Sequence, residues 1–268
     1  MNRAQLVSRI REKKSFLCIG LDTDLNKIPA SFKSFKDPVF EFNRIVIDQT
    51  KDFCVAYKLN AAFYEQNGTN GWESMQKTED YIPSGIFKIA DAKRGDIGNT
   101  SKQYAKAFFE HMHFDAITVS PYMGYDSISP FMEFEDKWVI ILALTSNKGS
   151  NDFQMLKTDE GFLYERVLKT SMKWGSRDNM MYVVGATHPE SFLPIRKIIP
   201  DHFMLIPGVG AQGGTVDDIG KYALNHDVGV LVNVSRAVLF PERQEDFPEN
   251  IRRAAWEYQQ QMIKWIFS

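Results

Sequence analysis

A charged segment at residues 89–100, IADAKRGDIGNT, contains the residue types best suited to catalysis in this chain. The apolar residues before Asp91 predict a buried strand, and side chains two apart on a strand share one face. We therefore expect Asp91 and Lys93 to point together into a polar pocket at the carboxyl end of that strand. Gly95 permits a sharp turn, so Asp96 is expected to point away from Lys93. An ammonium beside a carboxylate is either a structural ion pair or a positioned proton donor, and the residues around it decide between the two.

Lys58, on a different predicted strand, favours the catalytic interpretation. It lies inside the apolar run VAYKLN, where an unpaired ammonium would lose much of its favourable hydration. Such a lysine needs anionic partners, and Asp22 on the first predicted strand and Asp91 on the third are placed to supply them. The sequence thus predicts four alternating charges on three adjacent strands, namely Asp22, Lys58, Asp91 and Lys93.

A glycine-rich segment and the arginine that follows it predict a phosphate site. The sequence PGVGAQGG at residues 207–214 matches G-x-G-x-x-G, but it follows the seventh predicted strand instead of the first, and no acidic residue ends the next strand. A dinucleotide-binding fingerprint is therefore disfavoured. Bare backbone amides, a helix N-terminus and the guanidinium of Arg236 at the end of the eighth strand fit the phosphate site common in α/β barrels. A flexible loop with a surface arginine is the alternative.

Eight apolar runs, separated by helical patterns, are predicted to position these residues. Because the runs are continuous and do not alternate with polar residues, they favour a parallel sheet covered on both faces. We expect an α/β fold in which the sheet closes into a (β/α)8 TIM barrel; a doubly wound open sheet is the alternative. One domain would span residues 1–268, with an N-terminal helix and a C-terminal helix. The expected strands cover residues 16–22, 55–60, 85–93, 116–121, 138–145, 181–187, 203–208 and 228–234.

Three segments between the strands carry helix-start signals. They are Asp37-Pro38, Thr158-Asp159-Glu160 and Thr187-His188-Pro189-Glu190, and two of them place a proline just inside the start. The polar residues 146–157 predict a long loop after the fifth strand. Residues 248–267 carry the helical pattern of the expected C-terminal helix.

Composition and charge disfavour several classes of protein. The chain has 268 residues, of which 44% are hydrophobic and 25% charged, and its formal net charge is −2. This charge makes nucleic acid and anionic membranes poor partners, and the longest apolar run, 138–144, is too short to cross a bilayer. The first residues lack the apolar core of a signal peptide. Cys18 and Cys54 lie in apolar surroundings, which favours reduced thiols in a cytoplasmic protein. His111 and His113 stand without further ligands, so no metal site is expected.

The segment DAKRGDIGNT resembles the signature of the orotidine 5′-phosphate decarboxylase family, and GAQGG with the last-strand arginine resembles that family's phosphate site. The resemblance extends from Asp22 to Arg236. It implies a lyase of pyrimidine biosynthesis, a cytoplasmic decarboxylase that converts orotidine 5′-phosphate to uridine 5′-monophosphate (UMP) without a metal or organic cofactor. The polar segment 146–157 and the C-terminal helix make this chain longer than the compact members, and it looks like the longer-chain group.

The resemblance also implies roles for individual residues. Loss of carbon dioxide from a pyrimidine 6-carboxylate leaves a poorly delocalised carbanion, and Lys93 would supply both a cation and a proton at that carbon. Asp91 would lie near the departing carboxylate, either straining the ground state or orienting Lys93. Lys58 and Asp22 would bind ribose hydroxyls and hold the charge array. The remaining contacts would be Ser146 to the base, and Gln212, Arg236 and backbone amides near Gly210 and Ser235 to the phosphate.

A homodimer with shared active sites is the expected assembly. In the resembling family the second aspartate of D-x-K-x-x-D and the I-G-N-T residues after it enter the partner's pocket. Here those residues are Asp96, Ile97 and Thr100. A two-fold interface would make this exchange reciprocal.

Two other functions remain open. A related sugar-phosphate decarboxylase or aldolase, such as 3-keto-L-gulonate-6-phosphate decarboxylase, shares the D-x-K-x-x-D barrel but stabilises an enediolate with magnesium. A non-catalytic barrel that binds a phosphorylated ligand would keep Arg236 but has little use for two lysines among aspartates. Turnover, and its response to a chelator, separates the three functions.

Overall fold

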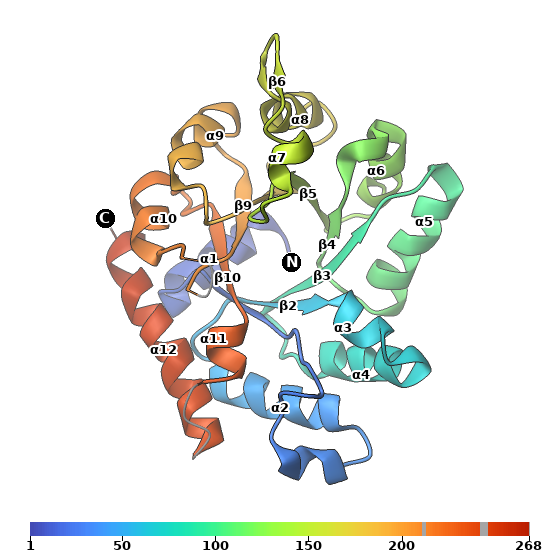
Figure 1. Ribbon diagram of the computed structural model, residues 1–268, viewed down its shortest axis with the longest axis vertical. Helices are drawn as coiled ribbons and strands as arrows, with labels where there is room; N and C mark the ends of the chain where they lie inside the picture. Colours follow the sequence, from blue (N-terminus) through green and yellow to red (C-terminus); the bar gives the residue numbers. More distant parts are fainter. Residues whose placement is uncertain (211–212, 242–245, 268) are drawn as a thin grey trace.

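Eight parallel strands close into a barrel in the computed structural model, which describes residues 1–210, 213–241 and 246–267. Figure 1 shows these strands at the centre, with most of the helices arranged around them. Around the barrel the strands follow the order β1-β10-β9-β8-β5-β4-β3-β2. The predicted α/β barrel is confirmed, and the open sheet is excluded. The strands are β1 (Leu17–Gly20), β2 (Ala56–Asn60), β3 (Phe87–Arg94), β4 (Ala116–Val119), β5 (Trp138–Leu144), β8 (Met180–Val184), β9 (Phe203–Pro207) and β10 (Val230–Val234).

Aromatic rings fill the amino end of the barrel. The rings of Phe87 and Trp138 meet edge to face with centroids 6.1 Å apart, and those of Trp138 and Phe203 do so at 6.3 Å. These three residues begin strands that are not neighbours, so their rings must meet inside the barrel. Because this end is packed with apolar side chains, the polar residues of the strands gather at the opposite, carboxyl end.

The N-terminal helix α1 (Arg3–Lys13) covers this closed end. Arg3 donates hydrogen bonds to the backbone oxygens of Arg177 and Asp201 and to the carboxylate of Asp227. Its guanidinium also lies 5.1 Å from the centre of the Phe203 ring. The helix is therefore attached to the amino end by a charged residue that satisfies loop carbonyls.

The remaining elements alternate with the strands or extend their loops. The longer helices form the outer layer (Figure 1), and shorter helices, turns and a two-stranded hairpin extend the connections. They are η1 (Ala30–Ser34), α2 (Pro38–Thr50), α3 (Ala61–Glu65), α4 (Gly68–Tyr81), α5 (Gly98–Lys106), η2 (Ala107–His111), η3 (Pro121–Met123), α6 (Tyr125–Met132), α7 (Ser150–Phe153), β6 (Lys157–Thr158), β7 (Gly161–Phe162), α8 (Leu163–Ser171), η4 (Pro189–Ser191), α9 (Phe192–Ile198), α10 (Val216–Tyr222), α11 (Arg236–Leu239) and α12 (Phe247–Ile266).

The helix-start predictions had mixed outcomes. Helix α2 begins as expected, because the Asp37 side chain accepts a hydrogen bond from the Phe40 amide and Pro38 needs no partner for its nitrogen. The expected start at residues 158–160 is wrong. Those residues enter the β6–β7 hairpin, which Thr158 closes by donating to the Gly161 oxygen, and Gly161 has a φ of 115° that a helix cannot use.

Two further expectations need adjustment. Residues 187–190 lead into the 3₁₀ turn η4, and the α-helix begins only at Phe192. The polar segment 146–157 is not wholly loop, since it contains the short helix α7. The C-terminal helix was predicted within a residue of its observed bounds, as α12 shows.

Within the described ranges, no helix is both long and apolar enough to cross a membrane. Cys18 and Cys54 are buried and free, as expected.

Candidate active site

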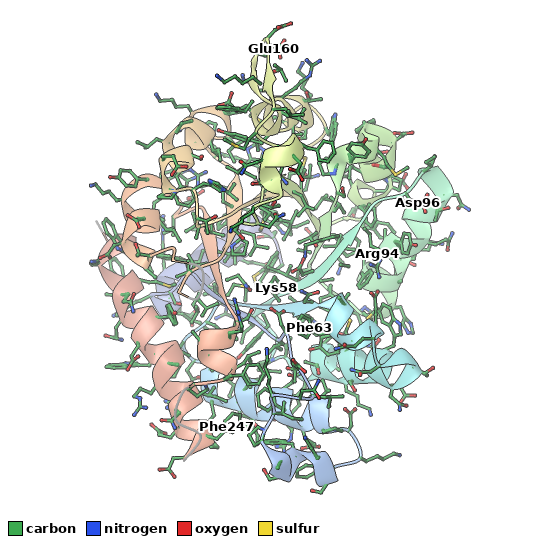
Figure 2. The ribbon with its side chains drawn as sticks, viewed as in Figure 1. Lys58, Phe63, Arg94, Asp96, Glu160 and Phe247 are labelled. Atoms are coloured by element: carbon green, nitrogen blue, oxygen red, sulfur yellow. The ribbon has the colours of Figure 1, made fainter. Side chains whose placement is uncertain are left out.

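A cavity of about 580 Å³ opens at the carboxyl end of the barrel. Residues on or just after all eight barrel strands line it, because parallel strands end at the same rim. Figure 2 shows Lys58 near the centre of the ring of strands, whereas Asp96 lies beyond the end of β3. The cavity therefore coincides with the strand ends where chemistry was expected.

The structure brings the four predicted charges together. The Lys58 ammonium lies 2.8 Å from Oδ2 of Asp91 and 3.3 Å from Oδ1 of Asp22. On the other side of Asp91, Oδ1 lies 2.6 Å from Nζ of Lys93. Asp91 thus lies between two ammonium groups, and Lys58 lies between two carboxylates. We call Asp22, Lys58, Asp91 and Lys93 the charge array.

Mutual pairing keeps the buried members of the charge array ionised. Lys58 is only 4% exposed, and its burial favours the neutral form, yet Asp22 and Asp91 together hold its pKa above the ordinary lysine value. Burial by itself would raise the pKa of Asp91, but the attraction and hydrogen bonds of Lys58 and Lys93 hold that pKa well below its usual range. Lys93 is half exposed and faces the cavity, so its ammonium is the most accessible cation of the array.

An irregularity in β3 sets the orientation of Lys93. Ala90 pairs with Ile117 of β4, but the next pair joins Arg94 to Val119, so three residues of β3 stand opposite one residue of β4. Within this bulge Lys93 has a φ of 48°, a left-handed conformation that costs a non-glycine residue about 1–3 kcal/mol. Asp91 and Lys93 do meet, as predicted. They meet across a bulge, however, and simple strand alternation does not account for the contact.

Ser235 contacts the charge array through its hydroxyl, which donates to Oδ2 of Asp22 at 2.8 Å. Gly20 makes room for this contact, because a Cβ at that position would lie 1.9 Å from the Ser235 oxygen. Asn233 extends the polar row, since its amide nitrogen lies 3.4 Å from the same oxygen and its carbonyl accepts from the Cys18 thiol. The sequence had suggested only a backbone contact for Ser235.

Ser146, after β5, and Arg236, after β10, both line the cavity. Ser146 follows β5, and its backbone packs so closely on Gly185 that a Cβ there would lie 2.7 Å from the Ser146 nitrogen. The preceding residue, Thr145, is held by Gln154, whose side-chain oxygen accepts from the Thr145 amide at 2.7 Å. The segment after β5 is thus fixed against the barrel next to Ser146.

Several predicted site residues do not line the cavity of this single chain. Asp96 accepts a hydrogen bond from the Ile97 amide, and the Ile97 side chain is 63% exposed; Thr100 is exposed as well. The role given to Gly95 needs correction, because the left-handed residues here are Lys93 and Gly98. Gly95 instead permits close approach, since a Cβ on it would lie 3.1 Å from the Ser120 oxygen.

The glycine-rich loop is only partly described. Gln212 lies outside the described residues. The Gly210 amide donates to the Gly214 oxygen at 3.0 Å, so in this structure it serves the loop itself and is not aimed at the cavity. Gly208 and Val209 do line the cavity, on the same side as Arg236 and Ser235.

Thr118 on β4 is a cavity residue that sequence reasoning missed. It is 1% exposed, accepts from the Lys93 amide and donates to Asp91. The sequence feature that could have identified it is the single hydroxyl residue in the otherwise apolar strand Ala116–Val119.

Comparisons with known proteins agree with this geometry. The family model described as "Orotidine 5'-phosphate decarboxylase / HUMPS family" matches residues 15–245. A protein named orotidine 5'-phosphate decarboxylase from Flavobacterium johnsoniae is 54% identical over 271 residues, covering 100% of this chain and 99% of its own length. The Bacteroides fragilis protein of that name is 52% identical over 268 residues, covering 98% of each. The solved structure of Leishmania donovani OMP decarboxylase has a TM-score of 0.86 and 36% identity, with 100% of both chains covered.

Proposed function

This chain belongs to the orotidine 5′-phosphate decarboxylase / HUMPS family, and we propose from that membership and from the charge array that it is a lyase of pyrimidine biosynthesis that converts orotidine 5′-phosphate to UMP. The observation that carries the proposal is the pairing of Lys58, Asp91 and Lys93 inside the barrel cavity. The magnesium-dependent and non-catalytic alternatives have no observation in their favour.

Lys93 supplies the proton. When the bond between the ring and its carboxylate breaks, carbon dioxide leaves and the electron pair stays on the ring carbon. A cation next to that carbon stabilises the developing charge, and transfer of a proton from Lys93 Nζ to the carbon completes the reaction. The 2.6 Å contact with Asp91 holds the Lys93 ammonium in the cavity before the reaction.

Asp91 and Lys58 act as one unit with Asp22. The depressed pKa of Asp91 means that a carboxylate, and not a carboxylic acid, faces Lys93 at neutral pH. A substrate carboxylate placed beside Asp91 would be repelled by the negative charge of Asp91. The departure of carbon dioxide relieves this repulsion. Asp22 is more exposed than Lys58. Its oxygens already contact Lys58 and Ser235, but each carboxylate oxygen can accept a second hydrogen bond, here from a ribose hydroxyl.

The phosphate is bound where β9 and β10 end, at the part of the cavity rim that Arg236 lines. Arg236 begins α11, directly after β10, and its guanidinium can form two parallel hydrogen bonds with a phosphate. The Ser235 backbone and the glycine loop lie on the same side, and Gln212 of that loop is proposed as a further ligand. Ser146, which follows β5 and lines the cavity, contacts the pyrimidine.

The active form is a homodimer in which Asp96, Ile97 and Thr100 of each copy complete the other copy's site. This proposal is supported by their position outside their own cavity and by the exposed apolar side chains beside them. Tyr122 and Met123 of η3 are 89% and 47% exposed. A surface of this kind next to an incomplete site is typical of an interface.

The two buried, free cysteines support a reducing, cytoplasmic location.

A single assay tests the function. Purified protein is mixed with orotidine 5′-phosphate in the presence of EDTA, and the conversion to UMP is followed by absorbance. The proposal expects turnover at the same rate with and without the chelator. Loss of turnover on chelation would favour the magnesium-dependent alternative, and tight binding without turnover would favour the non-catalytic one.

A further inference from the structure

Thr118 occupies the one position on β4 that faces the bulge of β3. Residues 91–93 of β3 stand opposite it, between the pairs Ala90–Ile117 and Arg94–Val119. Its side chain is almost fully buried but borders the cavity. A residue at this point can contact both ends of the bulge at once.

The Thr118 hydroxyl makes two hydrogen bonds with fixed direction. The Lys93 amide lies 3.0 Å from Oγ1, and Oγ1 lies 2.9 Å from Oδ1 of Asp91. A backbone N–H can only donate, so the hydroxyl oxygen accepts from Lys93 and its single proton is left for Asp91. Asp91 must therefore accept, as an ionised carboxylate does.

These contacts form a closed ring. The same Asp91 oxygen that accepts from Thr118 also lies 2.6 Å from the Lys93 ammonium. The chain of contacts thus runs from the Lys93 amide through the hydroxyl and the carboxylate to the Lys93 side chain. The Thr118 hydroxyl consequently holds both the left-handed backbone of Lys93 and Asp91, the carboxylate that pairs with the Lys93 ammonium.

We propose that Thr118 is a positioning residue that keeps Lys93 in its strained, reaction-ready conformation. The inference rests on the proposed role of Lys93 as proton donor. Without the hydroxyl, the Lys93 amide loses its partner, and the left-handed conformation loses a contact that offsets its strain. Asp91 then loses a donor and can rotate with Lys93 away from the reacting carbon, where small displacements are costly in rate.

Thr118→Val tests this proposal because valine keeps the shape and removes the hydroxyl. We expect kcat for orotidine 5′-phosphate to fall about tenfold to a hundredfold, with KM changed less than about threefold, as for loss of a charge-assisted hydrogen bond. Amide hydrogen exchange at Lys93, measured in the free protein, should accelerate. Thr118→Ser restores the hydroxyl and should return both readouts close to wild type.

A matched control separates positioning from general stability. Thr50→Val removes another buried hydroxyl, which lies on α2 outside the barrel. This hydroxyl donates to the Val46 oxygen and contacts the Tyr57 hydroxyl. It should destabilise the protein without changing kcat or exchange at Lys93. If Thr118→Val does not fold, Thr118→Ala removes the same hydroxyl without adding bulk and is measured in its place.

The exchange measurement also keeps the two proposals apart. If the wild-type protein does not decarboxylate the substrate, the proposed function fails, but accelerated exchange in the hydroxyl-free variant would still show that Thr118 holds the Lys93 backbone. The positioning proposal is overturned if the folded hydroxyl-free variant matches wild type in exchange. It is equally overturned if the serine variant is as impaired as the valine variant.

Discussion

Replacing Lys58 by methionine tests the charge array, because it removes one buried charge and leaves both of its partners in place. Lys58 is 4% exposed and contacts Asp91 and Asp22. Methionine has a similar length and can occupy the same apolar stem position. The effect on stability therefore reports the lost charge more than a lost volume.

The size of the stability loss depends on which contacts Asp91 and Asp22 keep when Lys58 is removed. Removing one member of a buried ion pair costs about 3–5 kcal/mol, because a buried charge is left uncompensated. Here Asp91 retains Lys93 and Thr118, and Asp22 retains Ser235 and is partly exposed. We therefore expect the lower end of that range, about 3 kcal/mol at neutral pH.

The loss should depend on pH with a defined sign. The folded pKa of Asp91 is depressed, so its contribution to stability is present above the unfolded pKa and is lost as the pH falls through the lower folded pKa. Without Lys58 that depression is smaller. The difference in stability between wild type and variant should therefore be largest above about pH 5 and should narrow below about pH 4, near the unfolded value for aspartate.

Urea unfolding followed by tryptophan fluorescence, near neutral pH and in mild acid, measures both effects. Lys77→Met is the control: this lysine is 48% exposed and pairs with Asp37 at 3.0 Å, so its removal should cost at most about 1 kcal/mol. A Lys58→Met protein as stable as this control, with no narrowing in acid, would refute the reasoning. It would mean that the buried array does not carry the charges assigned to it.

Three further experiments test individual roles. Lys93→Ala should fold and lose nearly all decarboxylation, since a positioned proton donor contributes about 10²–10⁴ in rate, and a kcat within about tenfold of wild type would remove Lys93 from the mechanism. Arg236→Ala should lower kcat/KM for orotidine 5′-phosphate by about 1.5–3 kcal/mol while barely affecting the nucleoside that lacks phosphate; equal losses on both substrates would show that Arg236 does not read phosphate. An equal mixture of Lys93→Ala and Asp96→Ala chains, refolded together, should regain about a quarter of wild-type activity, because about half of the randomly paired dimers are mixed and each holds one complete site. A mixture as inactive as its parents, with mixed dimers confirmed by mass spectrometry, would contradict the shared site.

Local sequence was enough to locate the strands and the central charges. A parallel strand covered on both faces must be apolar at consecutive positions, so runs such as MMYVV mark β8 without knowledge of its neighbours. Lys58 was informative for the same reason. A lysine inside such a run can be tolerated only beside carboxylates, and the strand order then indicated Asp22 and Asp91.

Helix boundaries were predictable where a cap acts within its own turn, and not otherwise. Asp37 accepts from an amide three residues on, and that contact needs no tertiary partner. Residues 158–160 carry a similar pattern, yet the left-handed Gly161 turns them into a hairpin. The competition between a capped helix and a glycine turn is settled by how the segment packs, which the pattern does not contain.

The geometry around Lys93 was decided by tertiary structure alone. Strand alternation predicted that Lys93 and Asp91 would meet, but the bulge that brings them together exists only because β3 pairs out of register with β4. The hydroxyl that holds it comes from Thr118, 25 residues further along the chain. A strained backbone has no local signature in the sequence, because the free energy that maintains it is supplied by a neighbouring strand.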